Sequence, residues 1–91
     1  MKERIYRICP GLFWVNDRHF VTVVDSVNAA SHSLEAEWAV LWRMLQQELP
    51  LDEIIRLYAG LFSISKPDAL AEIDRTLSQM ATLGFVEVVD G

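Results

Sequence analysis

The sequence predicts a small α+β domain in which strands come first, three helices follow and a short strand closes the chain. Between residues 33 and 49, large apolar side chains recur at steps of three and four, the spacing of one helical face. The run Phe20–Val24 is β-branched and aromatic, which favours a strand. A well-signalled third helix is followed at once by the alternating run Phe85–Val89. A three-stranded antiparallel sheet, three helices and a short C-terminal strand in this order predict a winged-helix-like fold.

The strands are expected in the first third of the chain. Residues 4–9 alternate apolar and polar side chains, and residues 12–15 continue an extended pattern after Pro10-Gly11. Residues 20–24 form the clearest strand. Val27–His32 is the expected third strand, and its small, polar side chains indicate the edge of a sheet.

The helices are placed by their end signals. The central helix is expected to begin with Ser33 as its N-cap and to end before Pro50. The second helix is expected over residues 51–61. The third begins at Ser65–Asp68, which offers a cap, a proline and an acid, and Gly84 follows its last turn. The apolar stripe of the central helix consists of Leu34, Trp38, Leu41, Trp42 and Leu45.

Length and composition predict one packed domain that covers residues 1–91. The 91 residues are 52% hydrophobic and 23% charged, which is typical of a globule rather than of a disordered chain. No apolar run approaches the roughly 20 residues needed to span a bilayer, so no membrane contact is expected. The single cysteine, Cys9, excludes an internal disulfide, which fits a cytoplasmic location.

The charge balance argues against a nucleic-acid partner. The net charge is −5, and it is uneven. Residues 1–33 hold four basic and three acidic side chains, whereas residues 34–91 hold four basic and ten acidic ones. A phosphate backbone requires a basic footprint, which the helical part of this chain lacks.

No pattern of catalytic or metal-ligating residues emerges. Cys9, His19 and His32 do not have the spacing of a closed zinc site. Most carboxylates fall in first helical turns or on polar faces, where capping and solubility explain them. We therefore expect no enzyme, no catalytic residue, no metal and no cofactor.

The expected edge strand points to a different kind of site. Its free N–H and C=O groups, together with the apolar stripe of the last helix, predict a groove for an extended peptide. The alternatives are an edge kept short and polar against aggregation, a winged-helix DNA-binding regulator, and a subunit that docks on an enzyme without binding peptide. An exposed edge also makes a homodimer conceivable.

The sequence resembles the PqqD-like family, the RiPP recognition elements that bind leader peptides. The resemblance spreads over most of the chain: Ile8–Leu12, the strand Phe20–Val24, the helical run Glu37–Trp42, Pro50–Ile55 and the ending Leu83–Val86.

The resemblance implies a non-catalytic, cytoplasmic peptide carrier. Such a domain binds the leader of a ribosomally made precursor peptide antiparallel to its third strand and against its third helix. It presents the peptide to a modifying enzyme, commonly a radical-SAM enzyme, a cyclase or a peptidase, in natural-product (RiPP or PQQ-like) biosynthesis. Carried onto this chain, the peptide-binding residues are Val27, Asn28, Ala29, Ala30, Ser31, His32, Leu70, Ile73, Asp74 and Leu77.

Overall fold

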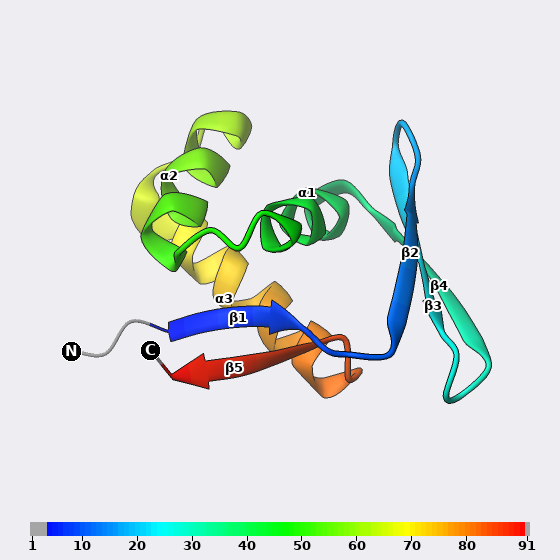
Figure 1. Ribbon diagram of the computed structural model, residues 1–91. Coiled ribbons are helices and arrows are strands. Elements are labelled where there is room, and N and C mark those ends of the chain that lie inside the picture. The colour runs from blue at the N-terminus through cyan, green and yellow to red at the C-terminus, as the bar shows by residue number, and fades with distance from the viewer. Residues whose placement is uncertain (1–3, 91) are drawn as a thin grey trace.

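The structure, a computed structural model, describes residues 4–90 and contains five strands and three helices within them (Figure 1). The order is β1 (Arg4–Ile8), β2 (Leu12–Asn16), β3 (Phe20–Asp25), β4 (Ala30–Glu35), α1 (Ala36–Gln46), α2 (Leu51–Phe62), α3 (Lys66–Thr82) and β5 (Val86–Asp90). The predicted α+β class is confirmed. No helix in this part of the chain has the length and apolar character needed to cross a membrane.

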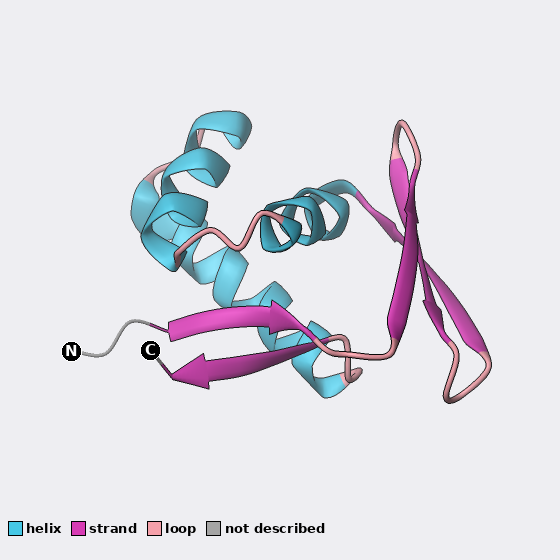
Figure 2. Cartoon of the chain, in the orientation of Figure 1, coloured by secondary structure: helices cyan, strands magenta, loops and turns pink. Residues whose placement is uncertain are grey.

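The strands form two separate antiparallel sheets. The three-stranded sheet has the order β2-β3-β4, so β3 is central and β2 and β4 are its edges. Its register places Trp14 opposite Val23 and Val23 opposite His32. The first strand does not join this sheet: β1 pairs with β5, and the two lie beside the helices rather than beside β2 (Figure 2).

The third strand of the sheet lies three residues later than the sequence predicted. The segment 27–32 was expected to be extended, but the strand is Ala30–Glu35 and residues 26–29 form a turn. The carboxylate of Asp25 accepts hydrogen bonds from the backbone N–H groups of Val27 and Asn28, at 3.0 and 3.2 Å. These bonds stabilise the turn, which competes with an extended backbone.

The prediction that Ser33 caps the central helix is therefore wrong. Ser33 lies within β4, and α1 begins at Ala36 after Glu35, whose side chain makes no capping hydrogen bond. The chain turns from strand to helix through Ala36, which has φ 51°. By contrast, the cap predicted for the third helix is confirmed, because the hydroxyl of Ser65 accepts from the N–H of Asp68 at 3.2 Å.

The core lies between the three-stranded sheet, the three helices and the β1–β5 pair. Trp42 of α1 is fully buried, and its ring meets those of Trp14 and Phe85 edge-to-face, with centroids 5.5 and 6.2 Å apart. Edge-to-face contact of this kind adds to the stabilisation from burial. Trp38, on the same helix, is only partly buried at the margin of the core.

Candidate peptide-binding groove

Among the described strands, β4 pairs with β3 alone, so its outer edge has a defined set of free backbone groups. The N–H of Asp17 donates to the carbonyl oxygen of Phe20 at 2.8 Å, which marks this facing pair as hydrogen-bonded. In an antiparallel ladder, hydrogen-bonded pairs alternate along the strands. Because the registers of the sheet are known, this pair identifies every hydrogen-bonded pair in it. The N–H and C=O groups of Ala30, His32 and Leu34 therefore point toward β3. The corresponding groups of Ser31, Ser33 and Glu35 face the open edge.

The side chains of β4 alternate between two environments. Leu34 is buried against the core, and the ring of His32, on the same face, lies 4.9 Å from the ring of Phe85. Ser31, Ser33 and Glu35 are exposed on the opposite face of the sheet. The free backbone groups thus belong to the residues whose side chains point away from the core.

A groove runs beside this edge on its core-facing side. It has a volume of about 370 Å³ and is lined by His32, Ser33, Leu34, Glu35, Trp38, Leu83 and Phe85. A second hollow of about 310 Å³ shares Trp38 and Leu83 with it and continues along the last turn of α3, past Gln79 and Thr82. The side chain of Leu83 is 53% exposed, so the groove has an apolar wall that solvent reaches.

The structure places the predicted peptide-binding residues on three segments: β4, the turn before it, and α3. Ala30, Ser31 and His32 lie on β4, at or beside the open edge. Val27, Asn28 and Ala29 lie in the turn before it, with Val27 83% exposed.

The predicted helical residues lie away from β4. Leu70, Ile73, Asp74 and Leu77 line a different cavity of about 200 Å³, together with Tyr6 and Leu51. Ile73 and Leu77 are fully buried and belong to the core. The structure therefore does not bring these four side chains to the edge strand.

Sequence reasoning missed the residues that line the groove beside β4. These are Ser33, Leu34, Glu35, Trp38, Leu83 and Phe85. A signal was present, because Ala30, His32 and Leu34 alternate with polar residues and would have extended the strand to residue 35. Leu34 also fits the apolar stripe of the helix that follows, so the same run predicts the start of that helix.

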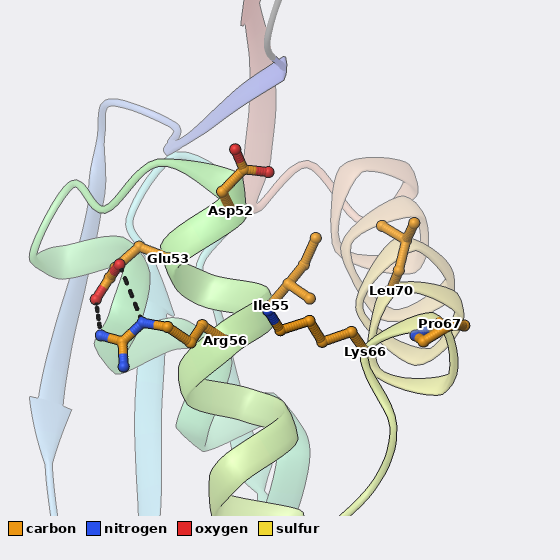
Figure 3. Close-up of a pocket in the computed structure, with 7 residues that line it drawn as sticks. All are labelled: Asp52, Glu53, Ile55, Arg56, Lys66, Pro67 and Leu70. Atoms are coloured by element: carbon orange, nitrogen blue, oxygen red, sulfur yellow. Dashed lines mark hydrogen bonds and ion pairs between the residues drawn. The ribbon is translucent and has the colours of Figure 1, made fainter.

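A further cavity lies between α2 and the start of α3. It has a volume of about 650 Å³ and is lined by Asp52, Glu53, Ile55, Arg56, Lys66, Pro67 and Leu70 (Figure 3). Lys66 extends from α3 toward Ile55, and Arg56 forms an ion pair with Glu53 along α2. The acidic and basic side chains that line this cavity are interspersed and exposed, so they create no strong electrostatic field for a charged ligand.

The titratable groups give little indication of catalysis. Burial, and secondarily the Glu87 carboxylate, raises the pKa of the Cys9 thiol, which disfavours the nucleophilic thiolate. Burial, and secondarily the hydrogen bond to Glu72, raises the pKa of Tyr58 to about 12. Across residues 4–90, no three His, Cys, Asp or Glu side chains gather in a group that could hold a metal ion.

No family model, no curated protein and no solved structure matches this chain.

Proposed function

We propose that this domain binds the leader segment of a ribosomally made precursor peptide by strand addition to β4 and presents it to a modifying enzyme. The observation that carries the proposal is the edge of β4, which is open among the described strands and lies directly beside a groove whose wall includes Trp38 and the exposed Leu83. The choice of a leader peptide follows from the resemblance of the sequence to the PqqD-like family. We also propose the winged-helix type of architecture, and a cytoplasmic location in which Cys9 stays a thiol.

Strand addition would arrange the peptide side chains in a definite way. An antiparallel peptide would exchange its hydrogen bonds with Ser31, Ser33 and Glu35. Its residues opposite His32 and Leu34 would then point to the core side, into the groove with Trp38. Two peptide residues separated by one position therefore supply the apolar anchors, and the residue between them faces solvent.

The DNA-binding alternative receives no support from the third helix. α3 carries Asp68, Glu72 and Asp74 against Lys66 and Arg75, which is an unfavourable balance for phosphate contacts.

The decisive experiment removes one free N–H from the β4 edge. The Ser33→Pro variant lacks the edge donor and keeps the donors that bond to β3, since proline is tolerated where a strand N–H faces solvent. Fluorescence polarisation would measure the affinity for labelled leader segments from short open reading frames encoded beside the gene. We expect micromolar or tighter binding of one leader by the wild type, and a loss of at least about tenfold in Ser33→Pro.

The matched control is Ser33→Ala, which removes the hydroxyl and retains the N–H. We expect this variant to bind as the wild type does. A folded Ser33→Pro variant with unchanged affinity would rule out strand addition at β4. Ala30→Pro is unsuitable as a test, because the N–H of Ala30 faces Asp25 in the ladder and its loss would weaken the sheet itself.

A further inference from the structure

The sheet has a second open edge, β2, which the proposed function does not use. β2 pairs with β3 alone among the described strands. The alternation of hydrogen-bonded pairs that starts at Asp17 directs the N–H and C=O groups of Leu12, Trp14 and Asn16 away from β3. Their backbone groups thus form a free row of donors and acceptors.

The β2 strand lacks the charged residues and the proline that keep many edge strands from pairing. The run Ile8–Asn16 contains no charged residue, and β2 itself contains no proline. Natural edge strands are usually protected by lysine, proline, inward charge or a covering segment. The β4 edge differs, because it carries Ser31, Ser33 and the charged Glu35.

The outward face of β2 is apolar and exposed. The side chains of Phe13 and Val15 are 64% and 66% exposed. Phe13 lies opposite Val24, which is 38% exposed, and Val15 lies opposite Thr22. This patch, defined by Phe13, Val15 and Val24, is continuous with the open β2 edge.

Two copies of β2 can pair antiparallel about its central residue, Trp14. If two copies pair antiparallel with their Trp14 residues opposed, Leu12 of one copy faces Asn16 of the other. Each of these hydrogen-bonded pairs exchanges two backbone bonds. In the same register, Phe13 of one copy faces Val15 of the other twice, and aromatic–β-branched pairs of this kind are favourable.

We infer that β2 pairs with the β2 strand of a second copy of this chain, forming a two-fold homodimer with a continuous six-stranded sheet. The strand order becomes β4-β3-β2-β2-β3-β4, so both β4 edges stay open at the two ends. The net charge of −5 per copy opposes association, whereas the uncharged run around β2 does not. Dimerisation should therefore strengthen when salt screens the overall repulsion.

The test compares two double variants that differ at one position. In Phe13→Glu/Val15→Glu, like charges face each other across the two-fold axis at both Phe13–Val15 contacts. In Phe13→Glu/Val15→Lys, opposite charges face each other in the same places. Sedimentation velocity over a concentration series would give the dimer dissociation constant of each protein and of the wild type, and circular dichroism melts would verify that both variants fold.

We expect a concentration-dependent dimer for the wild type. The Glu/Glu variant should dimerise at least about tenfold more weakly than the wild type, and the Glu/Lys variant should recover about tenfold over the Glu/Glu variant. A wild type that stays monomeric up to its solubility limit overturns the inference. Equal dissociation constants for the two variants overturn the β2–β2 register, whether both are weakened or both resemble the wild type.

Discussion

Two tryptophans four residues apart on α1 have different surroundings. Trp42 is fully buried, and its indole Nε1 has no hydrogen-bond partner, so its contribution comes from packing against Trp14 and Phe85. Trp38 is partly buried and lines the groove beside β4. The helical stripe predicted both side chains on one face, but periodicity does not tell where the core ends and a groove begins.

Replacing each tryptophan by alanine should separate folding from binding. Trp42→Ala should lower the free energy of unfolding by about 3–5 kcal/mol, because it leaves a large cavity in the core. Trp38→Ala should cost less stability and weaken leader binding by about tenfold or more, as loss of a central aromatic anchor does. Urea unfolding and fluorescence polarisation would measure the two effects. Unchanged peptide affinity in a folded Trp38→Ala variant would remove Trp38 from the binding site.

Tyr58 should make the domain sensitive to alkaline pH. Burial raises its pKa to about 12 in the folded chain, with a further contribution from its hydrogen bond to Glu72. An unfolded tyrosine ionises near pH 10. The stabilisation is therefore complete below pH 10 and is lost as the pH rises toward 12, because the unfolded state releases its proton first.

The Tyr58→Phe variant isolates this effect. At neutral pH it should be less stable than the wild type by about 1 kcal/mol, since it lacks the hydrogen bond to Glu72. The difference should shrink between pH 10 and 12, where only the wild type loses stability at this position. Denaturant unfolding at several pH values would measure it. A difference that stays constant across this range would contradict the raised pKa.

Two glycines near helix ends are expected to respond in opposite ways to alanine. Gly60 lies within α2, and a Cβ added there would meet nothing within 4 Å. Gly60→Ala should therefore raise stability by about 0.5–1 kcal/mol. Gly84 also has open space around it, but its φ is +82° at the turn between α3 and β5. Gly84→Ala should lower stability by about 1–2 kcal/mol.

Thermal or denaturant unfolding of the two variants would test this contrast. Because both sites are sterically open, the difference between them reports on the backbone conformation alone. Stabilisation by both substitutions would show that the turn at Gly84 does not require a left-handed residue.

The elements that the sequence predicted well are those whose signals are local. The third helix has its cap at Ser65 and its glycine at position 84, and each of these signals acts within a few residues at its own end of the helix. The terminal strand, expected from residue 85, begins at Val86. The partner of that strand could not be predicted, because β1 and β5 lie at opposite ends of the described chain and their pairing depends on the helices between them.

The predicted boundary between β4 and α1 is wrong for a different reason. Leu34 satisfies both an alternating pattern and a helical stripe, so periodicity alone leaves two solutions. In the structure, Leu34 pairs with Val21 and is buried on the sheet. The sequence therefore predicted an open edge strand, but the helix–strand error placed that strand three residues too early and left out the groove lined by Trp38 and Leu83.

At the scale of the whole molecule, the three-stranded sheet divides two proposed tasks between its edges. β4 faces the groove and is proposed to take the peptide, whereas β2 is proposed to take the second copy. β3 separates them, and two strand spacings amount to roughly 10 Å. A shared element could still couple the two edges, so their independence is open to measurement.

We expect substitutions at the two edges to act additively. Ser33→Pro should weaken peptide binding and leave the dimer dissociation constant unchanged, because the N–H it removes faces away from β2. Phe13→Glu/Val15→Glu should weaken dimerisation and leave the intrinsic peptide affinity of each copy unchanged. The combined variant should show both losses, with a coupling energy within about 0.5 kcal/mol of zero.

Peptide titrations, followed by sedimentation with and without the leader, would be made on four proteins: the wild type, Ser33→Pro, Phe13→Glu/Val15→Glu and the combined variant. A dimer that forms more tightly when peptide is bound would contradict the independence of the β2 and β4 edges. It would instead show that a strand added at β4 changes the twist or stability of β3 and thereby the pairing of β2, which would make dimerisation a response to the leader.

With independent edges, each dimer presents two equivalent grooves at the ends of one sheet, and the number of leaders bound per dimer should be two at saturation.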